Sequence, residues 1–211
     1  MYFPTYVMDN FFNDPDGVVK YAGSLDYAPC DESANWPGLR ADPSDDFRSK
    51  FFEKLMDLAL PFTEASITGK LYFQHIDSDE LDSGWIHHDH HSTLAGVVYL
   101  SKNSSIEDGT NLYRQIDISK SLYTSEAHTA KNKYFQDVEG RETLDIIKEE
   151  HNSKYEKTVQ VGNVFNRLLM YDASNAHGVP VINNDRLTLV FFLKIYSDWF
   201  PVPKAKQGFR L

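Results

Sequence analysis

The spacing of apolar residues divides the chain into a helical first part and a β-rich second part. Within residues 1–70, Asp14 followed by a proline marks the start of one helix, and Ser44 is placed to cap a second. Four apolar residues recur at helical spacing behind the second cap: Phe47, Phe51, Leu55 and Leu58. This periodicity predicts that residues 1–70 are largely helical.

From residue 71 onward the apolar residues form short runs separated by turn signals, which is typical of strands. The runs are Leu71–Phe73, Leu94–Leu100, Val159–Val161, Arg167–Tyr171 and Arg186–Ile195. Both alternating faces of the last run are mostly apolar. We therefore expect a sheet that is covered on both sides, with the N-terminal helices as one cover.

A polar, charge-rich excursion over residues 114–160 interrupts these strands, and its part from 142 to 156 has a helical pattern. Such a segment is either a solvated surface elaboration or a functional lid, and the sequence leaves both open. We predict a single domain over residues 1–211 that is mainly β with flanking α-helices. The β core is expected to occupy residues 71–200.

The 211 residues, 41% hydrophobic and 14% aromatic, are enough for one sizeable core. A net charge of −10 argues against broad binding to nucleic acid, and no apolar run approaches the roughly 20 residues that span a bilayer. The one cysteine, Cys30, cannot form an internal disulfide, and the N-terminus lacks the pattern of a leader peptide. We expect a cytoplasmic protein without nucleic-acid or membrane partners, and the oligomeric state stays open.

Four of the eight histidines lie between His87 and His91, around a single aspartate, Asp89. The cluster precedes an apolar run, so we place it on or beside a strand, where side chains two apart share a face. His87 and Asp89 then point together while His88 points away, and His91 is a lesser candidate on the first face. Imidazole nitrogen and carboxylate oxygen together are what a borderline transition metal binds.

A mononuclear Fe(II) site that binds a cosubstrate and oxygen needs three protein ligands on one face of the metal. His87 and Asp89 supply two, and the third should be a histidine from a later strand that the closing sheet brings near. His177, just after the Arg167–Tyr171 run, suits this role. The other histidines are less attractive, since they precede the cluster or lie in the excursion: His75, His128 and His151.

Arg186 opens the last predicted strand, and Thr188 shares its face. A guanidinium buried in a sheet needs an anionic partner. That partner is either an acidic side chain, which would make the arginine structural, or the carboxylate of a ligand. The position of Arg186 shortly after His177 favours a ligand.

At these residues the sequence resembles the Fe(II)- and 2-oxoglutarate-dependent oxygenases, particularly the prolyl 4-hydroxylase-like branch. The resemblance spans residues 70–196 and rests on these motifs: His87-x-Asp89, Val97–Leu100, Asp108–Tyr113, Asn166–Tyr171, His177 and Arg186-x-Thr188. Two departures are Asp108, where many relatives carry a glycine, and the long polar segment before Val159. Neither removes a metal or cosubstrate ligand, but both lie where this family shapes its substrate entrance.

The resemblance implies a double-stranded β-helix, or jelly roll, in which the two histidines and the aspartate bind Fe(II). It implies that Arg186, assisted by Thr188, holds the distal carboxylate of 2-oxoglutarate. Tyr72 or Gln74, which alternate on the strand before the motif, would line the cosubstrate pocket. The implied reaction consumes O2 and hydroxylates a C–H bond, with succinate and carbon dioxide as coproducts. Its substrate, a small molecule or a protein side chain, is not given by the sequence.

Three other interpretations compete with the oxygenase. A zinc hydrolase of the metallo-β-lactamase type needs His-x-His-x-Asp-His, and Trp85 stands where its first histidine should be. An HD-type phosphohydrolase would use the adjacent pair His88 and Asp89, but that architecture is helical. A jelly-roll module that binds a metal or another ligand without redox chemistry stays open as the alternative.

Overall fold

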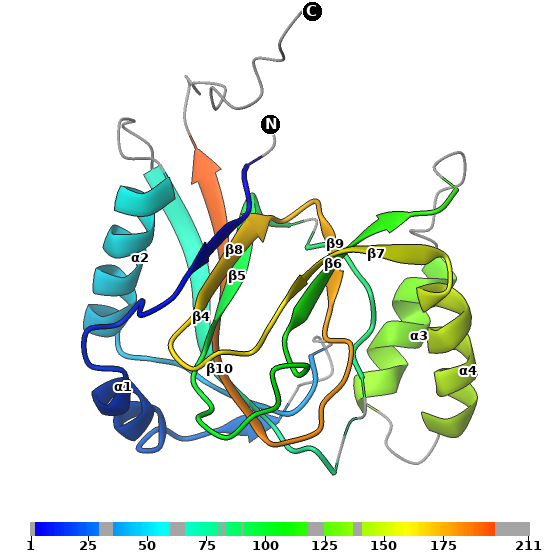
Figure 1. Cartoon of the computed structure of the whole chain (residues 1–211), viewed down its shortest axis with the longest axis horizontal. Coiled ribbons are helices and arrows are strands. Elements are labelled where there is room, and N and C mark those ends of the chain that lie inside the picture. The colour runs from blue at the N-terminus through cyan, green and yellow to red at the C-terminus, as the bar shows by residue number, and fades with distance from the viewer. Residues whose placement is uncertain are drawn as a thin grey trace, which may run out of the picture.

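Figure 1 shows the computed structural model of the chain, which describes residues 3–29, 36–59, 66–79, 81, 83–89, 91–117, 125–136 and 141–196. In chain order the elements are β1 (Tyr6–Met8), α1 (Pro15–Ala22), β2 (Ala28–Pro29), β3 (Leu39–Ala41), α2 (Asp45–Ala59), β4 (Ser66–Ile76), β5 (Leu94–Tyr99), β6 (Thr110–Gln115), α3 (Ser125–Gln136), α4 (Arg141–Asn152), β7 (Tyr155–Val161), β8 (Leu168–Asp172), β9 (Ala176–Gly178) and β10 (Arg186–Tyr196). Cys30 and His90 lie outside the described residues. Among the described helices, none has the length and apolar character needed to cross a membrane.

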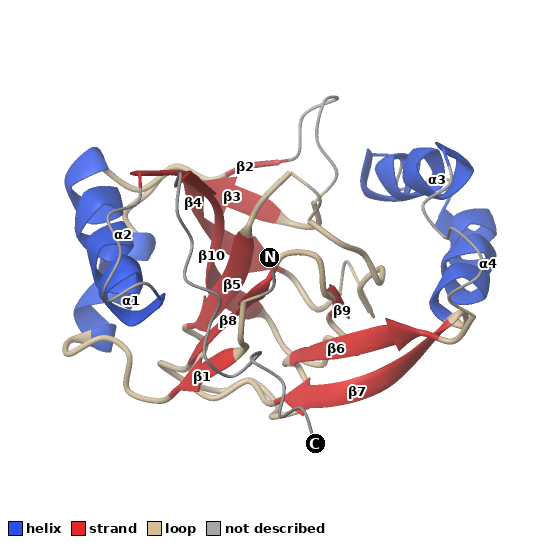
Figure 2. Ribbon diagram, turned by 90° about the horizontal axis from the view of Figure 1, so that it is seen from above, coloured by secondary structure: helices blue, strands red, loops and turns tan. Residues whose placement is uncertain are grey.

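The strands form two antiparallel sheets. The larger has seven strands in the order β1-β8-β5-β10-β4-β3-β2, and the smaller has three in the order β7-β6-β9. The smaller sheet lies to one side of the larger, and α1 and α2 lie to the other (Figure 2). The predicted fold class is confirmed: the protein is mainly β, with a jelly-roll core and helices packed on one sheet.

The outer face of the larger sheet is covered by α1 and α2. Phe51 of α2 packs edge-on against Phe191 of β10, with ring centroids 5.4 Å apart. The predicted caps are present, since Asp14 and Ser44 each accept a hydrogen bond from the backbone N–H three residues on. The helical periodicity of the first part therefore identified the residues that bury this face.

The inner face of the larger sheet carries polar groups among the apolar ones. Register partners in an antiparallel pair point to the same side, so Arg40 of β3, Gln74 of β4, Thr188 of β10 and Tyr99 of β5 form one row across four strands. Tyr99 belongs to the buried cluster that also contains residues of β6 and β7. The row therefore faces the interior between the two sheets.

The elements differ from the predicted ones in several places. The short strands β1, β2 and β3 fall within residues 1–70, where helices were expected, and they form by pairing with distant strands or with one another. The strands β6 and β9 also lie outside the predicted runs. In the excursion, α4 lies within the predicted helical part except for its first residue, and α3 was not expected. Both helices lie on the side of the molecule opposite α1 and α2 (Figure 1).

Candidate metal centre

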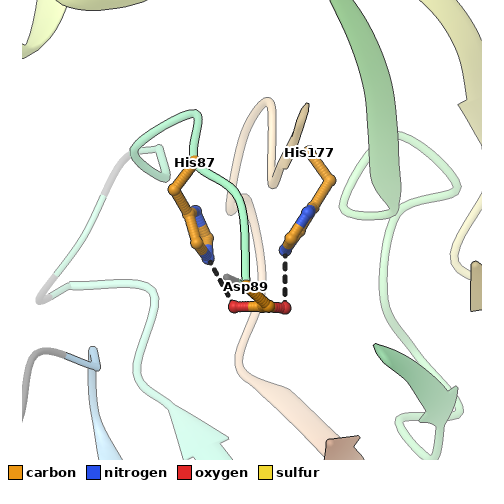
Figure 3. Close-up of side chains that lie close together, drawn as sticks. All are labelled: His87, Asp89 and His177. Atoms are coloured by element: carbon orange, nitrogen blue, oxygen red, sulfur yellow. Dashed lines mark ion pairs between the residues drawn. The ribbon is translucent and has the colours of Figure 1, made fainter. Parts of the chain in front are cut away.

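Two extended segments bring His87 and His177 side by side. The segment 83–89 is not itself a regular strand but lies beside one, because His87 forms a single antiparallel bridge with His177 of β9. The two residues exchange both backbone hydrogen bonds, each at 2.9 Å. The extended backbone keeps the expected alternation, because His87 and Asp89 point toward one another (Figure 3) while His88 reaches a backbone carbonyl elsewhere.

The carboxylate of Asp89 lies between the two imidazoles. Nε2 of His87 is 3.7 Å from Oδ1 of Asp89, and Nε2 of His177 is 3.3 Å from Oδ2 (Figure 3). The three ligand-type atoms all lie within 4.8 Å of one another. The side chain of His177 is 7% exposed and that of His87 is 31% exposed, so the group is open to solvent on the His87 side.

Hydrogen bonds to the far ring nitrogens fix the direction in which both histidines offer a lone pair. Nδ1 of His87 lies 2.7 Å from the carbonyl of Trp85, and Nδ1 of His177 lies 2.9 Å from the carbonyl of Asn175. A carbonyl only accepts, so in the neutral ring Nδ1 carries the proton and Nε2 presents its lone pair to Asp89. Histidines that bind metals are typically oriented by a bond of this kind.

The atoms of this group fit a divalent cation. Oδ2 of Asp89 is buried and has no hydrogen-bond donor among the described residues when His177 is neutral with its proton on Nδ1. Two imidazole lone pairs and a carboxylate thus converge without a donor among them. Two neutral histidines and one carboxylate are the ligand set of non-haem Fe(II) sites.

The surroundings of the triad favour the metal-binding forms of His87 and Asp89. Burial, the Lys131 ammonium and His177 together keep the pKa of His87 well below its usual range, so His87 is neutral at pH 7. Burial opposes ionisation of Asp89, but the positive charge and hydrogen bond that His177 supplies when protonated, the charge of protonated His87 and the Lys131 ammonium outweigh it and lower the pKa of that carboxyl. Metal binding requires these deprotonated forms.

The last residues of α4 hold the backbone immediately before His87. Nε2 of His151 is hydrogen-bonded to the carbonyl of Ile86 at 2.8 Å, and the Asn152 side chain accepts from the N–H of Ile86 at 2.9 Å. The Asn152 amide also donates to the carbonyl of Gly84 at 3.2 Å. No local pattern in the sequence indicates this contact, and His151, a weaker ligand candidate, here holds the backbone next to His87.

Arg186 lies buried on the inner face without a carboxylate partner. Its Nε donates to the carbonyl of Asp108 at 3.2 Å, and its guanidinium carbon lies 5.5 Å from the centre of the Tyr99 ring. Within the described part of the chain, no carboxylate lies within 4.0 Å of this guanidinium. Burial lowers the pKa of Arg186, as expected for a cation that lacks a compensating anion.

The side chain of Asp108 explains why the nearest acid does not pair with Arg186. Its Oδ1 accepts hydrogen bonds from the backbone N–H and the side-chain amide of Asn183, at 2.9 and 2.7 Å. Its Oδ2 accepts from the N–H of Ser105 at 3.1 Å. Asp108, a departure from the family pattern, therefore joins the turn before β6 to the loop before β10.

Thr188, Tyr72 and Gln74 share the inner face of the larger sheet with Arg186. Thr188 is fully buried, and its hydroxyl has no hydrogen-bond partner among the described residues. The Gln74 amide donates to the carbonyl of Pro37 at 2.8 Å, so its nitrogen holds the segment before β3. Tyr72 packs against the cluster between the sheets. Their predicted roles toward a cosubstrate stay predictions.

Solved structures of low sequence identity share this fold. HygX of Streptomyces hygroscopicus, with nickel, 2-oxoglutarate and hygromycin B, is 14% identical over 98% of this chain and 90% of its own, with a TM-score of 0.59. A Trichoplax adhaerens prolyl hydroxylase in complex with a peptide fragment is 14% identical over 90% and 83%, with a TM-score of 0.51. The epimerase SnoN from nogalamycin biosynthesis is 12% identical over 90% and 77%, with a TM-score of 0.54.

The fold is therefore that of the 2-oxoglutarate-dependent oxygenases, and identities this low show the fold alone. At the level of sequence, residues 3–189 match the family model described as a family of unknown function, DUF6445. The chain belongs to that family. No curated protein matches it.

Proposed function

We propose that this protein is an Fe(II)- and 2-oxoglutarate-dependent dioxygenase whose iron is held by His87, Asp89 and His177. The observation that carries the proposal is the convergence of two imidazole Nε2 atoms on the Asp89 carboxylate, with one ligand-type atom from each residue within 4.8 Å of the others. Three such ligands occupy one face of an octahedral metal and leave the other face for a cosubstrate and oxygen. The fold is compatible with this role.

Arg186 and Thr188 are proposed to bind the distal carboxylate of 2-oxoglutarate. The buried guanidinium offers a fork to a carboxylate, and the unpartnered Thr188 hydroxyl can donate to the same group. When bound, Fe(II) with 2-oxoglutarate supplies oxygen activation and hydroxylation of a C–H bond, with succinate and carbon dioxide as coproducts. The protein orients the ligands through the carbonyls of Trp85 and Asn175 and limits the access of water.

The primary substrate is proposed to be a small molecule or a protein side chain. The structures of similar fold include one with hygromycin B and one with a peptide fragment, so the fold does not choose between the two. We further propose that residues 1–211 act as one oxygenase domain, because the triad draws on the segment before β5 and on β9, while α4 holds that segment in place.

Anaerobic addition of Fe(II) and then 2-oxoglutarate to the purified chain tests this function. We expect a visible charge-transfer band from the iron chelate, followed by O2-dependent formation of succinate. Iron binding without the band would overturn the proposal and favour the non-redox jelly-roll module. A matched His177→Ala variant should show neither iron binding nor the band, because only two of the three proposed protein ligands remain.

A further inference from the structure

A second group of hydrogen-bond donors lies on the same inner face as the proposed cosubstrate residues. Arg40 is the register partner of Gln74, and Gln74 is the partner of Thr188, so Arg40 lies two strands from Thr188, or about 10 Å. Its guanidinium carbon is 4.4 Å from the centre of the Trp36 ring and 5.3 Å from that of Tyr72. Two aromatic rings therefore hold this cation at the inner face of the larger sheet.

The indole of Trp36 adds a donor beside Arg40. Its Nε1 is buried and has no hydrogen-bond partner among the described residues. The Trp36 ring stacks on Tyr72, with centroids 6.3 Å apart and planes 22° apart, so the indole N–H is held in one place. A buried donor of this kind without an acceptor costs free energy unless a ligand supplies one.

The helix α3 brings Lys131 to the same space from the other side. Its neighbours Ala130 and Tyr134 pack in one cluster with Trp85 and with Ile76, which is two residues beyond Gln74 on the inner face of β4. No acid within the described ranges lies within 4.0 Å of the Lys131 ammonium. The pKa of Lys131 is lowered to about 8, because burial and the charge of Arg40 together lower it by more than the Asp89 carboxylate raises it. The two cations therefore act on one another.

We propose that Trp36, Arg40 and Lys131 form a subsite beside the metal centre that binds an anionic group, a carboxylate or a phosphate, of the primary substrate. All three side chains donate hydrogen bonds and none accepts one, which selects an acceptor-rich ligand. An anion would also offset the repulsion between Arg40 and Lys131 across a poorly solvated space. This assignment of a substrate class rests on the proposed function, whereas binding of the anion itself does not.

Isothermal titration calorimetry of the full-length, metal-free protein with inorganic phosphate and with acetate tests the subsite. Lys131→Met should weaken binding of the preferred anion at least about tenfold, the loss expected for one charge-assisted hydrogen bond. Trp36→Phe, which removes only the indole N–H, should weaken it about threefold to tenfold. The matched control is Lys133→Met, which changes an exposed lysine of the same helix and should leave the affinity unchanged.

The outcomes separate this inference from the proposed function. Failure of both anions to bind the wild-type protein, or equal binding by the wild type and Lys131→Met, would overturn the subsite. An equal loss in the Lys133→Met control would also overturn it, since the effect would then reflect helix charge alone. Thermal unfolding of each variant shows whether it is folded. If Lys131→Met is not folded, the anion affinity of Trp36→Phe decides whether the subsite exists. The iron charge-transfer band of the wild type is recorded separately, and its absence refutes the proposed function but not the subsite.

Discussion

Replacing Thr188 by valine should stabilise the protein without ligands and weaken its binding of 2-oxoglutarate. The hydroxyl of Thr188 is fully buried and has no hydrogen-bond partner in the part of the chain that the structure describes. A buried unsatisfied polar group costs about 1–3 kcal/mol, and valine has nearly the same shape without that group. We expect the free energy of unfolding to rise by about 1 kcal/mol or more, which raises Tm by about 2–4 °C per kcal/mol in a chain of this size.

Thr110→Val is the matched control, since Thr110 lines the same interior. Its hydroxyl accepts a hydrogen bond from the buried Tyr99 hydroxyl at 2.9 Å, and valine would leave that donor unpaired. This control should lower the free energy of unfolding by about 1–3 kcal/mol. The same substitution should therefore raise the free energy of unfolding at Thr188 and lower it at Thr110.

Urea unfolding and calorimetry, each with and without Fe(II) and 2-oxoglutarate, measure both effects of Thr188→Val. Ligand at one hundred times its Kd adds about 2.7 kcal/mol to the wild type. The variant should gain less at the same concentration, because it has lost one donor to the ligand carboxylate. A variant that is less stable than the wild type without ligands, or that gains as much from 2-oxoglutarate, would refute the reasoning.

Further predictions concern the ligands, the contact with α4 and the anion subsite. His177→Ala should abolish iron-dependent turnover, and conversion of 2-oxoglutarate at the wild-type rate would show that the third ligand is misassigned. Arg186→Ala should raise the 2-oxoglutarate requirement about tenfold or more, and an unchanged requirement would make this arginine structural. Asn152→Ala leaves the N–H of Ile86 unpaired, so it should lower the free energy of unfolding in urea by about 1–3 kcal/mol and also weaken Co(II) binding. A loss of stability with unchanged Co(II) affinity would show that Asn152 does not help to place the proposed ligands. Acetate stays charged above pH 7, so its affinity should fall about tenfold per unit above pH 8 as Lys131 loses its proton, and a flat profile in calorimetry would exclude Lys131 as the partner.

The residues of the candidate metal centre could be chosen from the sequence because the relevant pattern is local. Residues two apart on extended backbone share a face, and this rule selected His87 and Asp89 although their segment makes only one bridge and not a regular strand. His177 required only the expectation that a closed sheet brings a later strand near. The helix that covers the outer face of the larger sheet could be predicted equally well. Phe51 and Leu55 follow helical spacing and are buried where that helix meets the sheet.

The contacts that the sequence did not reveal all join distant segments. Asn152 and Ile86 are 66 positions apart, and no periodicity at either place records their hydrogen bond. The short strands β1 and β3 form by pairing with the edges of β8 and β4. Their extended conformation depends on the partner strand and not on the apolar pattern of their own residues. Lys131 lies on a helix whose sequence is polar enough to resemble a surface segment.

These distant contacts decide how the excursion over residues 114–160 relates to the site. The end of α4 makes three hydrogen bonds to Gly84 and Ile86, and α3 packs on Trp85 with Tyr134. Swinging α4 away as a lid would break those bonds and leave the backbone before His87 without them, at about 1 kcal/mol or more for each. The excursion therefore supports the proposed metal ligands through α4, while α3 carries Lys131 of the proposed subsite. If both proposals hold, the two helices of one excursion position the substrate and His87, so a small shift of α3 and α4 should change the substrate and metal geometry together.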